Sequence, residues 1–103
     1  MLLKVGERLR GAADRTEIVV VKAPAADTDL RCGGFPVVPV AGGAADPDAT
    51  ISPAHADGTL LGKRYEDEET GVEVLCTKAG TGSLSVGERP LTVRGAKPLP
   101  SSD

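Results

Sequence analysis

The residues of this 103-residue chain best suited to nucleophilic catalysis or metal binding are its two cysteines and its single histidine. Cys32 stands in the run Arg-Cys-Gly-Gly, where Arg31 and nearby backbone amides are expected to lower the pKa of a thiol and leave it exposed. A nucleophilic thiol also needs a base within reach, and the chain offers only His55. Cys32 is therefore interpreted as a reactive thiol, a metal ligand or a packing residue, and Cys76 as a core residue.

The other polar motifs do not have the types or the spacing of a reaction centre. The four consecutive acidic residues 66–69 are typical of a solvated turn, because they lack the spaced ligands of a calcium loop. Gly80 and Gly82 are not followed by the Lys-Ser/Thr pair of a phosphate-binding loop. We therefore predict no catalytic residues and no cofactor, and we do not expect the chain to be an enzyme.

The charge and hydropathy of the chain argue against nucleic acids and membranes as its binding partners. The net charge is −3, the sequence pI is near 5.1 and no basic run exceeds two residues. This balance disfavours nucleic-acid binding, because phosphate neutralisation needs clustered Lys and Arg. No stretch is long and apolar enough to span a bilayer, and the N-terminus lacks the apolar region of a secretory signal. Two cysteines are too few for a disulfide framework, so we expect a soluble cytoplasmic protein without a membrane partner.

Two stretches of the chain repeat one another, which must be recognised first because a missed duplication mis-assigns the fold. Moving the sequence by 56 positions places Gly62, Arg64, Glu73, Lys78 and Ala79 on Gly6, Arg8, Glu17, Lys22 and Ala23. After a length difference of two residues, Leu84, Gly87 and Pro90 fall on Leu30, Gly33 and Pro36. We therefore divide the chain into a first copy at 1–40, a linker at 41–58, a second copy at 59–95 and a tail at 96–103.

Short β-branched runs bounded by Gly and Pro favour strands over helices. Strands are expected at residues 5–9, 17–23, 36–40, 60–65 and 72–77, and residues 83–93 are typical of a hairpin around Gly87. No segment keeps the helical period. The predicted class is all-β. His55, within the 41–58 linker, is expected to be solvated, with a metal ligand or a general base as the alternatives.

Several residues of the second copy carry a family likeness, namely Gly62, Tyr65, Gly71, the run Val72 to Cys76, Gly80, Gly82, Leu84, Pro90 and Leu91. They resemble the pattern G-x-x-Y-x-C-x-x-C-G, strand, G-x-G-x-L-x-C-C-G-x-P-M of the desulforedoxin-like domain, a small rubredoxin-type module. Domains of this family can pair as homodimers. The resemblance therefore implies two small rubredoxin-like β modules that pack as an intramolecular pseudo-dimer.

This chain lacks most of the cysteines of that pattern, and their loss determines what the resemblance implies about metal binding. In the family, four cysteines hold one iron. The matching positions here are Gly11, Asp14, Cys32 and Gly33 in the first copy, and Asp67, Thr70, Val86 and Gly87 in the second. Only Cys32 keeps a thiol, and Val and Gly side chains cannot bind a metal. The resemblance thus implies a scaffold that has lost its redox centre, in which burial of residues such as Val86 replaces the metal.

We therefore expect a non-catalytic accessory or assembly subunit that binds a larger protein or enzyme complex, or that self-associates. The edge strands at residues 36–40 and 91–94 are predicted to form the contact surface, because unpaired strand edges and scarce aromatic side chains are natural docking points. The predicted contact residues are Phe35, Val38, Val40, Leu91 and Val93.

Two alternatives belong to other classes of protein. The first is an iron- or zinc-binding electron-transfer protein that uses Cys32 with non-cysteine ligands or with ligands from a second chain. Asp14, Cys76 and His55 are the candidate additional ligands. The second is a small thiol enzyme with Cys32 as its nucleophile.

Overall fold

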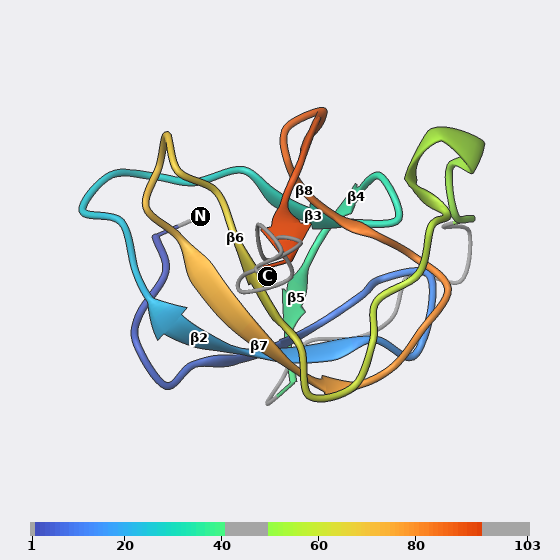
Figure 1. The fold of residues 1–103 in the computed structure, drawn as a ribbon, viewed down its shortest axis with the longest axis horizontal. Helices are drawn as coiled ribbons and strands as arrows, with labels where there is room; N and C mark the ends of the chain where they lie inside the picture. The colour runs from blue at the N-terminus through green and yellow to red at the C-terminus, as the bar shows by residue number, and fades with distance from the viewer. Residues whose placement is uncertain (1, 41–49, 94–103) are drawn as a thin grey trace, which may run out of the picture.

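The computed structural model describes residues 2–40 and 50–93 and confirms the predicted all-β class (Figure 1). The N-terminal half contains β1 (Arg8–Arg10), β2 (Glu17–Lys22), β3 (Leu30–Cys32), β4 (Phe35–Pro36) and β5 (Val38–Pro39). A short 3-10 helix, η1 (Pro53–His55), follows. The C-terminal half contains β6 (Arg64–Glu66), β7 (Glu73–Lys78), β8 (Leu84–Val86), β9 (Arg89–Pro90) and β10 (Thr92–Val93).

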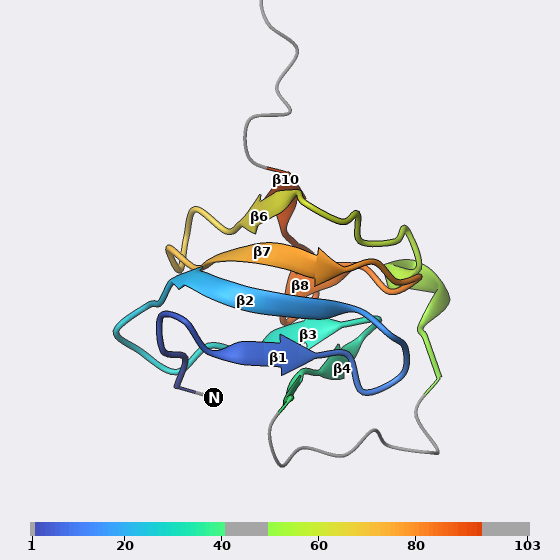
Figure 2. The same ribbon diagram turned by 90° about the horizontal axis from the view of Figure 1, so that it is seen from below.

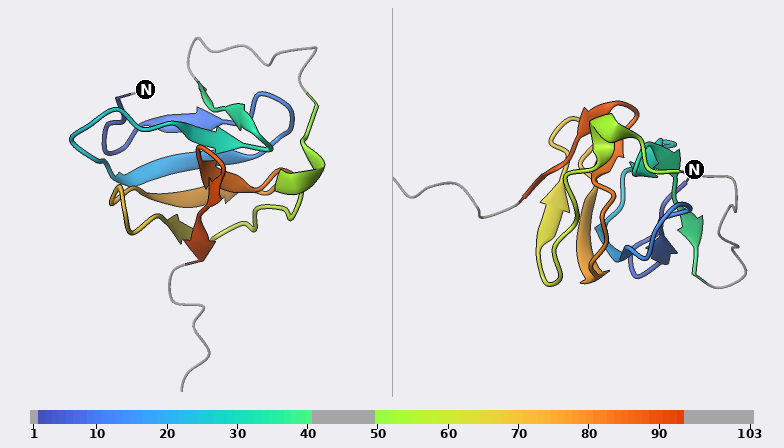
Figure 3. Two further views of the ribbon diagram at one scale, coloured as in Figure 1. Left: turned by 90° about the horizontal axis from the view of Figure 1, so that it is seen from above. Right: turned by 90° about the vertical axis from the view of Figure 1, so that its right-hand side faces the viewer.

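The strands form two antiparallel sheets that lie as two layers (Figures 1 and 3). The six-stranded sheet has the order β10-β6-β7-β2-β1-β5, and the four-stranded sheet has the order β4-β3-β8-β9. Both halves of the chain supply strands to both sheets. Figure 2 shows β6, β7, β2 and β1 side by side in front of β3 and β4.

The two halves of the chain meet at the centre of each sheet. In the six-stranded sheet, Ile18 on β2 lies opposite Cys76 on β7, and Val20 lies opposite Val74. In the four-stranded sheet, β3 pairs with β8 and places Cys32 opposite Leu84. The strongest strand predictions, 17–23 and 72–77, thus correspond to the central pair β2 and β7.

The core lies between the sheets and is almost entirely aliphatic. Ile18, Val20 and Val74 from the six-stranded sheet are at most 1 % exposed, and Leu30 and Leu84 from the four-stranded sheet are at most 3 % exposed. Tyr65 is the aromatic member of this cluster. Because burial contributes about 25 cal/mol per Å² of apolar surface, a core with so little aromatic surface depends on these aliphatic contacts between the halves.

Two predicted strands begin later than expected because a tight turn precedes each of them. Residues 5–9 and 60–65 were expected to be extended, but Glu7 N donates to Lys4 O over 3.0 Å and Lys63 N donates to Leu60 O over 3.3 Å. The third residue of each turn is a glycine, Gly6 with φ +87° and Gly62 with φ +81°, a conformation that other residues rarely adopt. The strands therefore start at Arg8 and Arg64.

The predicted single strand at 36–40 is wrong, because it is two short strands in different sheets. β4 pairs with β3 in the four-stranded sheet, and β5 pairs with β1 in the six-stranded sheet. Between them Val37 is 2 % exposed, and its backbone N donates to Leu30 O over 3.1 Å. This buried corner turns the chain from one sheet to the other. The predicted hairpin at 83–93 contains the turn at Gly87, with φ +60°, between β8 and β9.

The C-terminal part of the predicted linker packs on the sheets. His55 ends η1 and is buried, so the expectation of a solvated side chain is wrong. Its backbone N donates to Ser52 O over 2.8 Å, and its carbonyl accepts from Ser83 N over 2.9 Å. Residues 41–49 of the predicted linker and the predicted tail at 96–103 lie outside the described residues.

The two halves of the chain occupy equivalent places in the two sheets. If β1 to β5 are matched in order with β6 to β10, each strand and its match lie at the same distance from opposite edges of their sheet. Matched hydrogen bonds recur. Gly6 N donates to Val20 O over 2.8 Å, and Gly62 N donates to Cys76 O over 2.9 Å. Across the halves, Gly33 N donates to Ser83 O over 3.0 Å, and Gly87 N donates to Asp29 O over 2.8 Å.

Candidate functional site

The loop between β1 and β2 places Asp14 where the two halves of the chain meet. Its carboxylate accepts hydrogen bonds from the Thr16 backbone N over 3.1 Å and from Thr16 Oγ1 over 2.7 Å. It also accepts one from Gly82 N over 2.7 Å, across 68 residues of sequence. A side chain at Gly82 would lie 3.1 Å from this carboxylate, and one at Gly80 would collide with it. The glycines of the 80–82 turn are therefore needed for this close approach.

Cys32 lies beside this carboxylate and is buried, with its Sγ 3.8 Å from Asp14 Oδ1. Burial, together with the negative charge of Asp14, raises the pKa of the Cys32 thiol to about 12. The expectation that Arg31 lowers this pKa is wrong, because the Arg31 guanidinium lies 2.8 Å from the Asp29 carboxylate instead. At neutral pH the thiol is therefore protonated, which is unfavourable for a nucleophile.

The first-copy positions that match metal ligands in the resembling family are close together. A Cβ at Gly11 would lie 3.2 Å from Cys32 Sγ, and Asp14 touches the same sulfur. However, no group of three or more His, Cys, Asp and Glu side chains suited to hold a metal occurs within residues 2–40 and 50–93. Cys76 donates instead to Lys78 O over 3.3 Å, and burial raises its pKa. The candidate ligand set of Cys32, Asp14, Cys76 and His55 is thus not assembled in the described chain.

Within residues 59–95, the positions aligned with metal ligands of the resembled family are used for hydrogen bonds and packing. Asp67 accepts from Thr70 Oγ1 over 2.7 Å, and Arg89 donates to both of its oxygens over 2.8 Å each. The Arg89 guanidinium lowers the pKa of the Asp67 carboxyl well below its usual range. Glu69 lies 3.0 Å from the same arginine, and Val86 packs against the core. The acidic segment 66–69 is therefore anchored by Arg89 rather than being simply a solvated turn.

The predicted docking residues differ in their exposure. Phe35, Val38 and Val93 are half-buried, Val40 is 36 % exposed, and Leu91 is buried within the core cluster. They lie on or beside the outer strands β4, β5 and β10. Leu91 is therefore not available to a partner without repacking.

Proline occupies three of the four edge strands of the two sheets, with Pro36 on β4, Pro39 on β5 and Pro90 on β9. Proline has no N–H with which to extend a sheet. A partner strand would therefore find few free donors along these edges.

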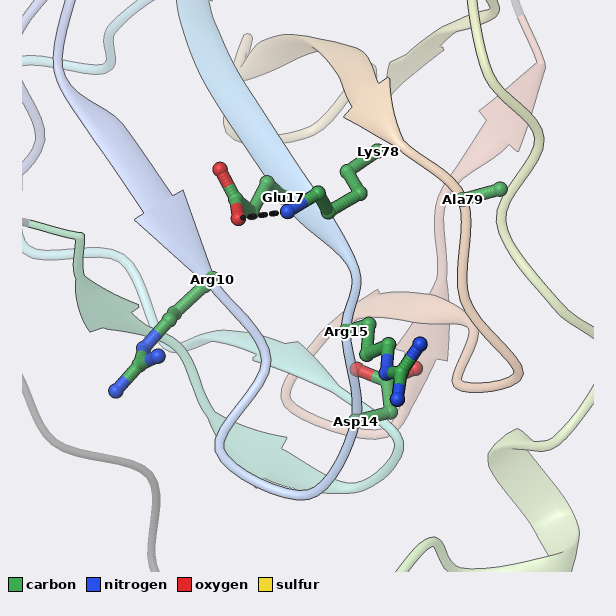
Figure 4. Close-up of a pocket in the computed structure, with 6 residues that line it drawn as sticks. All are labelled: Arg10, Asp14, Arg15, Glu17, Lys78 and Ala79. Carbon is green, nitrogen blue, oxygen red and sulfur yellow. Dashed lines mark ion pairs between the residues drawn. The ribbon is translucent and has the colours of Figure 1, made fainter.

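A hollow of about 490 Å³ lies at the ends of β1, β2 and β7 (Figure 4). Its charged lining comprises Arg10, Asp14, Arg15, Glu17 and Lys78. Glu17 is paired with Lys78 over 3.2 Å, and Arg10 points away from this pair. Because the cations do not point toward a common position, this hollow does not form a defined anion site.

Comparison of the chain with family models, with curated proteins and with solved structures finds no match. Among the described residues, no helix has the length and apolar character needed to cross a membrane. The assignment of a function therefore depends on the geometry of the chain itself.

Sequence reasoning missed the role of Asp14 and the burial of His55. The alignment of residues 1–40 with 59–95 places Asp14 on Thr70, so it does not indicate the role of this carboxylate. The Gly-x-Gly at 80–82 carries a signal, since paired glycines indicate a close approach of backbone to another group. Nothing in the local sequence at 53–55 indicates that His55 is buried.

Proposed function

We propose that this chain is a non-catalytic accessory or assembly subunit that binds a larger protein or enzyme complex, and that its scaffold consists of two similar metal-free β modules. The observation that carries the proposal is the use of the former ligand positions. Asp14 bridges Thr16 and Gly82, Asp67 is held by Arg89, and Val86 packs on the core. The hydrogen bond from Gly82 to Asp14 joins the two halves, whereas Asp67 and Arg89 lie in the same half. Among the described residues, no group of three or more side chains is placed to hold a metal.

The matched strand order and the reciprocal hydrogen bonds of Gly33 and Gly87 support a duplicated scaffold. A module that does not obtain folding energy from a metal needs another source of it. Pairing of β2 with β7 supplies buried aliphatic contacts between the halves. Both cysteines are free thiols, which fits the cytoplasmic location that we propose.

Native co-purification of the full chain from its own cells, followed by mass spectrometry, tests this function. We expect a stoichiometric larger partner, and analytical ultracentrifugation of the purified chain separates such a partner from self-association. A monomer that co-purifies with no other protein would contradict the proposal.

A second candidate function, an iron- or zinc-binding redox protein, is favoured by one observation, the 3.8 Å approach of Cys32 Sγ to Asp14. It requires further ligands, for example from a second chain. Metal analysis and an absorption spectrum of the purified protein separate the two candidates, because iron–thiolate charge transfer colours a sample. Stoichiometric metal would favour this second function over the first.

A further inference from the structure

A row of four residues crosses the central strands of the six-stranded sheet. Arg8 on β1 lies opposite Val19 on β2, and Val19 lies opposite Leu75 on β7. Leu75 in turn lies opposite Arg64 on β6. Residues directly opposite one another on neighbouring strands point to the same face of a sheet. The four residues, called the Arg-Val-Leu-Arg row below, thus place an apolar pair between two arginines.

The row lies on the outer face of the sheet, away from the core. Its strand neighbours Leu9, Ile18 and Val74 point to the other face and are at most 1 % exposed. Within the row, Val19 and Leu75 are half-buried, Arg8 is exposed and the Arg64 side chain is 55 % exposed. Figure 2 looks onto this face, with β3 and β4 behind it. A hollow of about 270 Å³ beside the row is lined by Arg8, Glu17, Val19 and Thr77.

The charges around the row favour an acidic partner. Glu17 is already paired with Lys78 over 3.2 Å, and Glu73 lies 3.8 Å from Lys22 and 3.6 Å from Arg64. Arg8 has no ion pair within the described part of the chain. The exposed charge at the ends of the row is therefore positive, although the whole chain carries −3. Two copies of this face would repel each other, whereas an acidic surface would be attracted.

We propose that the Arg-Val-Leu-Arg row is the docking surface for an extended acidic segment of the partner, an inference that rests on the binding function proposed above. Neighbouring strands lie about 4.8 Å apart, so the two arginine backbones, three strand spacings apart, are separated by about 14 Å. An extended chain rises about 3.4 Å per residue, so side chains four residues apart on one face are separated by about the same distance.

A segment with the pattern Glu-x-Leu-x-Glu therefore matches the row when it crosses the strands. Each glutamate reaches one arginine, which binds carboxylates through two parallel hydrogen bonds. The leucine between them covers the Val19 and Leu75 side chains. The docked segment uses side chains rather than strand edges, which agrees with the prolines at Pro36, Pro39 and Pro90 on the edges.

The test uses the capped peptide Ser-Glu-Ser-Leu-Ser-Glu-Ser as the probe and the full chain labelled for NMR. We expect saturable shifts of the Val19 and Leu75 amides, and none with a peptide in which lysine replaces both glutamates. Absence of saturable shifts, or shifts centred elsewhere on the molecule, would overturn the proposal. A single-stranded RNA oligonucleotide that shifts the same amides at lower concentration than the peptide would also overturn it.

A matched pair of double variants separates this docking from general charge attraction. Arg8→Gln with Arg64→Gln should raise the peptide Kd about tenfold, whereas Lys4→Gln with Lys63→Gln, which removes the same charge from exposed turn residues, should change it less than twofold. If both double variants raised the peptide Kd equally, the proposal that the Arg-Val-Leu-Arg row is the docking surface would be overturned. Because Arg64 also contacts buried Glu73, the single variant Arg8→Gln is compared with Lys4→Gln if the first pair fails to fold.

Failure of this inference is distinguishable from failure of the proposed function. If a stoichiometric partner co-purifies equally well with the Arg8→Gln variant and with the unaltered chain, the subunit role stands and the row is rejected. If no partner co-purifies with the unaltered chain, the subunit role itself fails.

Discussion

Removal of the Asp14 carboxylate should destabilise the protein more than any single exposed acid does. The variant Asp14→Ala leaves two backbone donors, Thr16 N and Gly82 N, without their acceptor. Thr16 and Gly82 are both buried, with Thr16 only 1 % exposed. A buried donor left unsatisfied costs about 1–3 kcal/mol, while the Thr16 hydroxyl can rotate toward another group. The expected loss is therefore about 2–4 kcal/mol of the free energy of unfolding.

For a domain of this size, such a loss corresponds to a fall in Tm of roughly 8–30 °C. Urea unfolding followed by far-UV circular dichroism measures the change directly. The variant Asp14→Asn keeps one side-chain oxygen as an acceptor, so it should lose about half as much.

The matched control is Asp57→Ala, which removes an exposed acid and should stay within about 0.5 kcal/mol of the unaltered chain. A loss below about 1 kcal/mol for Asp14→Ala, or one equal to that of the control, would refute the view that this carboxylate joins the two halves.

Three further predictions concern the second acidic loop, the buried thiol and the outer strand β4. Because Arg89 lowers the pKa of Asp67 in the folded state, the pair contributes stability that is complete above the unfolded pKa near 3.9 and is lost as pH falls below it. Arg89→Gln should raise the Asp67 pKa measured by NMR toward its ordinary range, and an unchanged value would contradict the pairing. Iodoacetamide at neutral pH should leave Cys32 unmodified until urea unfolds the chain, as read by mass spectrometry, whereas rapid alkylation of the folded protein would revive the thiol-enzyme hypothesis. Phe35→Ala should weaken partner co-purification more than it lowers Tm, and undiminished co-purification would remove Phe35 from the contact surface.

The central strands could be predicted from the sequence because local and long-range requirements agree there. The β-branched residues that favour a strand between Glu17 and Lys22 are also the residues that fill the core, with Ile18 and Val20 at 1 % exposure. Alternation of side chains then leaves Val19 on the outer face. The all-β class and the pair of longest strands follow from this agreement.

The starts of the strands β1 and β6 could not be predicted in the same way. Val5 and Leu61 have strand-forming apolar side chains, yet they stand in turns and are 68 % and 66 % exposed. The following glycines Gly6 and Gly62 adopt positive φ and end the extended conformation. The apolar composition of these segments favours a strand, but the positive φ of the glycine in each segment produces a turn instead.

The candidate site was partly predictable, because its residues come together through contacts distant in sequence. The structure places Gly11, Asp14 and Cys32 close together. These are positions that the desulforedoxin-like pattern groups and that local pattern alone does not. The sequence gives no information on the pKa of Cys32, because that pKa depends on burial of the thiol in the core between the sheets and on the direction in which Arg31 points. The burial of His55 likewise depends on contacts with the turn that ends at Ser83.

The mixed origin of both sheets has a consequence for synthesis on the ribosome. β2 can pair with its neighbour β7, and β3 with its neighbour β8, only after residues 73–86 have been added. The first forty residues therefore leave the exit tunnel with Ile18, Val20 and Leu30 still in water, and they cannot close their own apolar interior. We therefore expect the two sheets to form only after β8 has emerged, at a rate that reflects pairing between distant strands. A chaperone that binds extended aliphatic segments would have its opportunity in that interval.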